Sequence, residues 1–157
     1  TPLQLAVMTS RSVNGGRPVL PRLVKNERAE IQKRKPLQLS PQHLHIVLKG
    51  MDKVVNGSQG TARKVVDQSM KFQFGGKSGS VQVKRISLDE RESGKLKNKD
   101  RPWHERDHAM FVAFAPLKSP RYVVSVVVEH GGGGSTMAAP IARDILAEAL
   151  RLNPSKL

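Results

Sequence analysis

The sequence predicts an α+β fold in which an antiparallel β-sheet carries helices on both faces. Two segments, 110–115 and 122–128, are apolar at nearly every position, which is typical of central strands covered on both sides. The connection between them, 117–120, is short and therefore favours an antiparallel hairpin. Helical patterns before and after these strands supply the covering layers. With 157 residues, the chain is long enough for one domain with a core.

The first two helices are predicted from their boundaries and their periodicity. A helix over 1–14 has Thr1 as N-cap and Pro2 at its first position, and Leu3, Val7 and Met8 give it an apolar face. A second helix covers 40–56, where apolar residues recur at spacings of three and four. That stripe, predicted to be buried, consists of Leu44, Val47, Leu48, Met51, Val54 and Val55.

The remaining elements follow in order. A short helical turn is predicted at 61–66, and strands at 72–74 and 80–86. The element 77–80 is expected on an edge strand antiparallel to 110–115, since sequential strands are usually neighbours. The segment 87–107 is polar and has no period, and because so long a structureless connection is unusual, we interpret it as a mobile loop. A last helix covers 138–152. Its predicted inward residues are Ile141, Ile145, Leu146 and Leu150.

The most informative stretch is the glycine-rich segment 75–80, which precedes alternating apolar residues. It places a cation, Lys77, beside two hydroxyls, Ser78 and Ser80, with Gly79 between them. Glycines allow another molecule to approach the backbone closely. A strand edge of this composition can hold an anion by charge and hydroxyl hydrogen bonds while it offers backbone N–H donors. The simpler alternative is a tight turn in which Lys77 is solvated.

Two other function classes each match one feature of the sequence. The net charge of +14 would suit a basic module that binds nucleic acid or an anionic surface, but no helix-turn-helix or zinc-finger spacing is present, so we expect no nucleic acid. His104-Glu105 followed by His108 is a literal zinc-protease motif, with Glu129 as a possible third ligand. That motif needs one helix to carry both histidines, and a strand pattern follows it. We therefore expect no metal and no other cofactor, and keep the zinc metalloprotease as an alternative.

Six blocks, in the same order, resemble the transpeptidase domain of class B penicillin-binding proteins, most closely the cell-elongation type called penicillin-binding protein 2. The resemblance covers most of the chain outside about 25–38 and 87–107. The blocks are 1–6 with 14–16, 57–62, 76–80, 108–116, 126–131 and 138–145.

The resemblance implies a function for the glycine-rich segment. It implies a D,D-transpeptidase that cross-links peptidoglycan stem peptides by serine acyl transfer and is acylated by β-lactams. Lys77 would supply positive charge for a carboxylate and assist proton transfer, and Ser78, Gly79 and Ser80 would bind that carboxylate. The backbone N–H of Ser80 would be one oxyanion donor. The family usually has Thr where this chain has Ser80.

The family's nucleophile motif, Ser-x-x-Lys, is not present in this sequence. The resemblance therefore identifies residues 1–157 as the C-terminal part of a transpeptidase domain, which we expect to be inactive alone. It also implies stem peptides, a lipid-linked precursor and elongation-complex membrane proteins, including a glycosyltransferase, as partners. The expected location is the periplasmic side of the bacterial inner membrane, with the anchor outside this chain.

Overall fold

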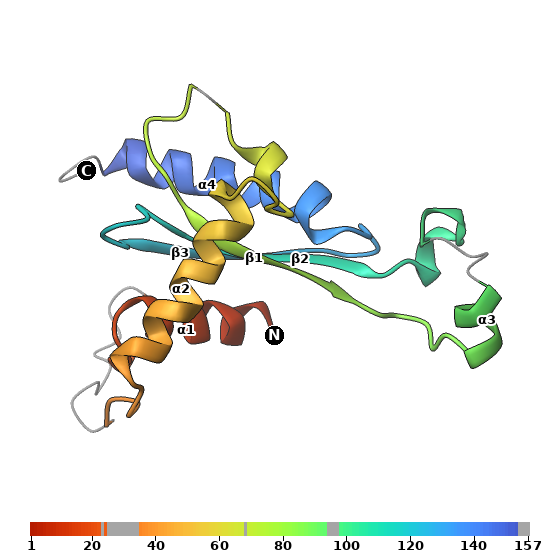
Figure 1. The fold of residues 1–157 in the computed structure, drawn as a ribbon, viewed down its shortest axis with the longest axis horizontal. Helices are drawn as coiled ribbons and strands as arrows, with labels where there is room; N and C mark the ends of the chain where they lie inside the picture. The colour runs from red at the N-terminus through yellow and green to blue at the C-terminus, as the bar shows by residue number, and fades with distance from the viewer. Residues whose placement is uncertain (23, 25–34, 68, 94–97, 154–157) are drawn as a thin grey trace.

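The computed structural model describes residues 1–157 except 23, 25–34, 68, 94–97 and 154–157. Its centre is an antiparallel sheet in the order β1-β2-β3 (Figure 1). The strands are β1 (Gly75–Val81), β2 (His108–Ala115) and β3 (Tyr122–Val128). The predicted α+β class and the hairpin of the last two strands are confirmed.

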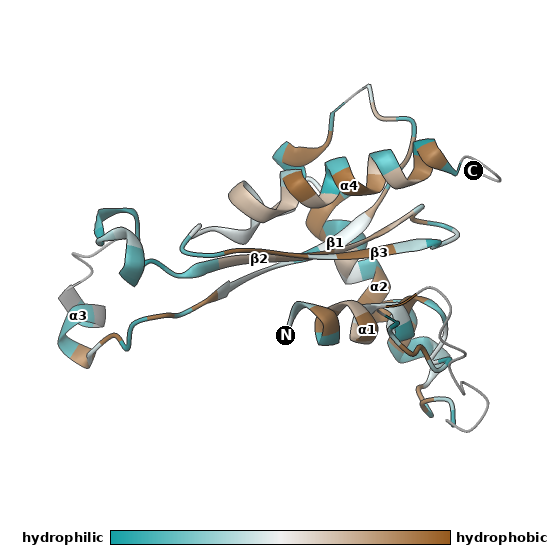
Figure 2. Ribbon diagram, turned by 180° about the vertical axis from the view of Figure 1, so that it is seen from behind, coloured by the Kyte–Doolittle hydropathy of each residue, from teal (hydrophilic) through white to brown (hydrophobic). Residues whose placement is uncertain are grey.

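Helices lie on both faces of this sheet, as Figure 2 shows from behind. On one face, α4 (Ala139–Leu152) packs on β2 and β3. On the other, α1 (Pro2–Val13) packs on β3 and β2, while α2 (Pro41–Asn56) contacts β1. None of the described helices is long and apolar enough to cross a membrane.

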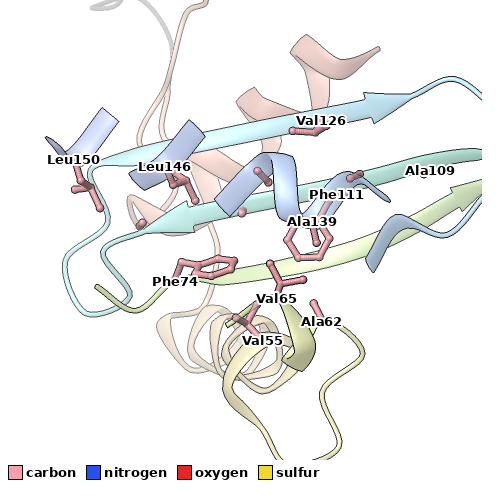
Figure 3. Packing of buried hydrophobic residues seen from close by; sticks show 14 residues of the cluster. Val55, Ala62, Val65, Phe74, Ala109, Phe111, Val126, Ala139, Leu146 and Leu150 are labelled. Carbon is pink, nitrogen blue, oxygen red and sulfur yellow. The ribbon is translucent and has the colours of Figure 1, made fainter. Parts of the chain in front are cut away.

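The main core lies between the sheet and α4 (Figure 3). Phe74, Phe111 and Leu146 are fully buried there. In α4, Leu146 and Leu150 point inward as predicted, but Ile141 and Ile145 are 43% and 47% exposed, so their predicted burial was wrong. The buried stripe instead continues to the small residues Ala142 and Ala139, at spacings of four and three.

The predicted apolar stripe of α2 is buried only in its C-terminal half. Met51 and Val55 are buried, whereas Val47 is 52% exposed. The reason is that α2 reaches the sheet only near its C-terminal end, where Asn56 Nδ2 donates to the Phe74 carbonyl at 3.0 Å. The apolar face predicted for α1 is likewise largely exposed. Leu3 and Met8 are about half exposed.

The strand predicted at 72–74 is not a strand in the structure, and the one predicted at 80–86 lies earlier in the chain, because β1 ends at Val81 and contains the whole glycine-rich segment. Gly75 and Gly76 fit there because they pack against aromatic rings. A Cβ at Gly75 would lie 2.7 Å from the Phe114 ring, and one at Gly76 would overlap the Phe111 ring. The predicted helical turn at 61–66 is confirmed by the 3-10 helix Arg63–Val65.

The segment predicted to be a structureless loop, 87–107, contains short helices. These are α3 (Leu88–Ser93), η3 (Asn98–Asp100) and η4 (Trp103–Glu105), on an arm that projects from the end of the sheet (Figure 1). Ser87 and Glu90 form a reciprocal cap, because the Ser87 N–H donates to the Glu90 carboxylate and the Glu90 N–H donates to the Ser87 hydroxyl. The same Ser87 contacts lower the pKa of Glu90. The predicted mobility of the arm stays a prediction, and its residues 94–97 lie outside the described part.

Candidate functional site

The glycine-rich segment forms a strand with one unpaired side. Within the described residues β1 pairs only with β2, which agrees with the expectation that it lies at the edge next to 110–115. Lys77 lies opposite Val112, Ser78 opposite Phe111 and Ser80 opposite Ala109. An edge strand of this kind leaves alternate backbone N–H and C=O groups free for another extended chain.

The register places Lys77 on one face of the sheet and the two serines on the other, since side chains alternate along a strand. Lys77 and Val112 line a cavity with Met51 and Val54 of α2, on the face that α1 also covers. Ser78 and Ser80 lie on the face of Phe111 and α4. The structure thus keeps all the predicted site residues on one strand but separates the cation from the hydroxyls.

Lys77 is exposed and has no acidic partner within hydrogen-bonding or ion-pair distance in the described structure. Its Nζ donates to the carbonyl of its neighbour Ser78 at 2.7 Å. A lysine whose charge is not neutralised by a carboxylate is available to an anionic ligand. Gly79 leaves open space on the same strand, because a Cβ there would meet only the Met110 side chain, at 3.5 Å.

Ser80 is tied to a part of the chain that is distant in sequence. Its Oγ donates to the Gly132 carbonyl at 3.2 Å, and the Gly132 N–H donates to the Asp107 carbonyl at 2.8 Å. Behind this contact, Gly134 begins the π-helix Gly134–Ala138. A Cβ at Gly134 would lie 2.5 Å from the Gly79 carbonyl oxygen and closer still to that of Met110, so the chain here touches the strand backbone directly.

The segment 130–134, called here the glycine turn, has an unusual backbone conformation that contacts of histidine side chains stabilise. His130 has a φ of 55°, a left-handed value that is uncommon outside glycine. Its N–H donates to Nδ1 of His108 at 2.9 Å, and its ring lies 4.4 Å from that of Trp103. This arrangement was not predicted from the sequence, where His108 belongs both to the zinc motif and to the block 108–116 of the family resemblance.

The zinc-protease alternative finds no support in this geometry. His104 lies in the three-residue helix η4, while His108 begins β2, so no helix carries both. Nδ1 of His108 already accepts the His130 N–H. In the part of the chain that is described, no group of three or more His, Cys, Asp or Glu side chains is close enough to hold a metal ion.

A three-stranded antiparallel sheet between helices, with a Lys-Ser-Gly edge strand, is the arrangement that the resemblance to penicillin-binding transpeptidases predicts. Comparison with known proteins agrees, because residues 1–147 match the penicillin binding protein transpeptidase domain. The chain belongs to the penicillin-binding protein transpeptidase family.

Two curated relatives are similar to nearly the whole chain. The peptidoglycan D,D-transpeptidase MrdA of Haemophilus influenzae is 37% identical over 154 residues, which cover 93% of this chain and 23% of that protein. MrdA of Salmonella typhimurium strain LT2 is 31% identical over 93% of this chain and 24% of its own length. The chain thus spans about a quarter of the length of these curated relatives.

Solved structures show the same similarity. The crystal structure of Pseudomonas aeruginosa PBP2 in complex with WCK 5153 superposes with a TM-score of 0.73 and 33% identity, over all of this chain and 32% of that one. The complex of PBP2 with MreC from Helicobacter pylori gives a TM-score of 0.71 and 27% identity, over 98% of this chain and 25% of the other.

Proposed function

We propose that residues 1–157 are the C-terminal part of a peptidoglycan D,D-transpeptidase domain that cross-links stem peptides by serine acyl transfer and binds β-lactams. The observation that carries this proposal is the open edge of β1, which bears Lys77, Ser78 and Ser80 in a chain of the transpeptidase family. The names of the relatives support the same activity.

In this proposal Lys77 attracts the terminal carboxylate of a stem peptide or β-lactam and assists proton transfer. The serine nucleophile comes from a segment outside this chain. Its hydroxyl loses a proton to a nearby base as the oxygen attacks the carbonyl carbon, the C–N bond breaks, and the amine nitrogen takes up that proton. With a stem peptide, water or the amine of a second stem peptide then attacks the acyl-serine ester and releases the enzyme, whereas with a β-lactam the ester persists as a stable adduct. Ser78 and Gly79 bind the carboxylate meanwhile, whereas the Ser80 hydroxyl gives its one proton to the Gly132 carbonyl, so Ser80 contributes through its backbone.

The backbone N–H of Ser80 is proposed to stabilise the oxyanion. Backbone groups of a strand alternate between its two sides, so residues 78 and 80 direct theirs to the same side. The Ser78 carbonyl accepts from Lys77 Nζ, which supports an assignment of that side to the open edge. An N–H fixed there before the reaction lowers the barrier without reorganisation, because it already points at the developing charge.

The proposed partners are stem peptides, the lipid-linked precursor, β-lactams and elongation-complex membrane proteins, including a glycosyltransferase. The solved PBP2–MreC complex of Helicobacter pylori supports an elongation-type assembly for this protein too. The proposed location is the periplasmic side of the bacterial inner membrane, with an anchor outside this chain.

The test is covalent labelling of the longer protein that contains residues 1–157. A fluorescent penicillin should form a stable adduct that survives denaturing electrophoresis, and excess unlabelled penicillin should prevent it. A protein that binds DNA with a steep salt dependence and takes no label would support the basic binding module instead.

A further inference from the structure

The glycine turn, 130–134, lies directly behind the part of β1 that is proposed to bind the oxyanion. Two contacts join them: the Ser80 hydroxyl bonds the Gly132 carbonyl, and Gly134 touches the backbone of Gly79. The turn is therefore in direct contact with Gly79 and Ser80, which also pair with β2. The position of the Ser80 N–H depends on what holds the turn.

The first support of the turn is His108. Nδ1 of His108 accepts the His130 N–H at 2.9 Å, so this nitrogen carries no proton and the ring proton is on Nε2. The ring of His130 is fixed as well, because its Nδ1 lies 3.0 Å from the Arg106 carbonyl, which can only accept. These bonds, with the Trp103 ring on one side, maintain the left-handed φ of His130.

The second support comes from the root of the arm. The Asp107 carbonyl accepts the Gly132 N–H, and the Asp107 N–H donates to Asn98 Oδ1 at 2.9 Å. Arg101 is only 7% exposed, and its Nη1 lies 3.7 Å from the Asp107 carboxylate. Asn98 also packs on Gly132, where a Cβ would lie 2.7 Å from its Nδ2. The arm and the turn thus form one hydrogen-bonded unit.

We propose that His108 is a positioning residue for the oxyanion strand, acting through the His130 amide and Gly132 to fix the backbone of Ser80. This inference rests on the proposed function, because it assigns a purpose to the Ser80 N–H. His108 touches no reacting group. Its effect is to prevent movements of a few tenths of an ångström at the donor, which are enough to weaken transition-state stabilisation.

Three substitutions of His108 separate this role from packing. His108→Asn places an amide oxygen close to the position of Nδ1 and keeps the acceptor, whereas His108→Gln places its amide near Nε2. His108→Leu removes the acceptor altogether. In the longer protein, we expect the Leu and Gln variants to slow acylation by a fluorescent penicillin about tenfold, a fraction of the effect of losing an oxyanion donor. The initial, non-covalent affinity should stay within about threefold, and the Asn variant should acylate at nearly the original rate.

A role in packing alone predicts a different result. All three variants would then lower the melting temperature and the active fraction, with an unchanged rate constant per folded molecule. The inference would be overturned if His108→Leu were acylated at the wild-type rate, or if His108→Asn were acylated as slowly as His108→Leu. If His108→Leu does not fold, the pair Asn98→Ala and Asn98→Asp replaces it, since only Asp keeps the acceptor for the Asp107 N–H. Equal rates in that pair would also overturn it.

Two controls separate this inference from the proposed function. Amide hydrogen exchange needs no catalysis: exchange in 77–81 and 130–134 should be faster in His108→Leu but unchanged in His108→Asn, and equal exchange in both contradicts the positioning role. Lys77→Ala tests the site itself. If acylation is slow in Lys77→Ala but normal in His108→Leu, only the positioning role fails. A wild-type protein that takes no penicillin label contradicts the proposed function itself.

Discussion

Lys77 and Ser78 are neighbours in β1, but their side chains project to opposite faces of the sheet, as the pairing with Val112 and Phe111 shows. Lys77 faces the cavity beside α2, whereas Ser78 faces the side of α4. A ligand that needs both must lie along the open edge, where side chains from either face can converge. The two residues should therefore be separable by mutation.

Lys77→Ala should slow β-lactam acylation of the longer protein about a hundredfold, since the loss of one charged transition-state contact costs on the order of 3 kcal/mol. Its melting temperature should barely change, because Lys77 is exposed and its only described bond is to a backbone carbonyl. The matched control is Lys118→Ala, an exposed lysine in the connection between β2 and β3. A rate for Lys77→Ala within about threefold of the wild-type value contradicts the proposed role.

The 157-residue chain alone should form no covalent adduct with penicillin. The chain contains no Ser-x-x-Lys, so the proposed site has a charge and one oxyanion donor but no activated serine. Incubation with a fluorescent penicillin and denaturing electrophoresis measure this, with the longer protein as the positive control. A stable label on residues 1–157 would show that a nucleophile has been overlooked.

Much of the fold could be predicted because it follows from local pattern. The apolar strands and the helix boundaries at Pro2, Pro41 and Pro140 are all visible in the sequence. The start of β1 was not, because glycine has low β propensity and Gly76 is in the strand for a tertiary reason, its contact with the Phe111 ring. The capping pair Ser87 and Glu90 is a signal for α3 that is visible in the sequence but was not part of the prediction of a loop.

The candidate site, like the fold, could be predicted from the sequence only in part. The edge residues Lys77 and Ser80 were recognised from their order in the sequence, yet their separation onto two faces follows only from the register. The approach of His108 to His130 could have been deduced, since a hairpin that pairs Ala109 with Val128 brings the next residues together. The bond from Ser80 to Gly132 could not, because it depends on how the turn after β3 crosses the sheet.

The chain should bind no stoichiometric zinc. His104 and His108 lie in different elements, and His108 uses Nδ1 as an acceptor within the protein. A zinc site needs its histidines directed at one point, which these backbone positions do not provide. Elemental analysis after dialysis measures the metal content. One zinc per chain that is lost in His108→Ala would restore the protease alternative.

Limited trypsin digestion should cut first in the arm, within 91–99. The helix α3 has only six residues, too few for a stable isolated helix, and Leu88 is 70% exposed. Cleavage at Arg101 should be slower, since that side chain is buried against Asp107. Mass spectrometry of the first fragments identifies the site. Initial cleavage within 40–55 or 138–152 would show that the arm is not the weakest segment.

Two glycine substitutions should change stability in opposite directions. Gly134→Ala should destabilise the chain by about 1–3 kcal/mol, because its Cβ would overlap backbone oxygens of Gly79 and Met110 that cannot move without shifting the sheet. Gly50→Ala should stabilise it by about 0.5–1 kcal/mol, since Gly50 lies inside α2 with nothing near the new methyl group and alanine has the higher helix propensity. Thermal unfolding followed by circular dichroism gives both values. If the two variants melt at the same temperature, the close packing of the glycine turn on β1 is not a feature of the folded protein, and the proposed link to Ser80 loses its basis.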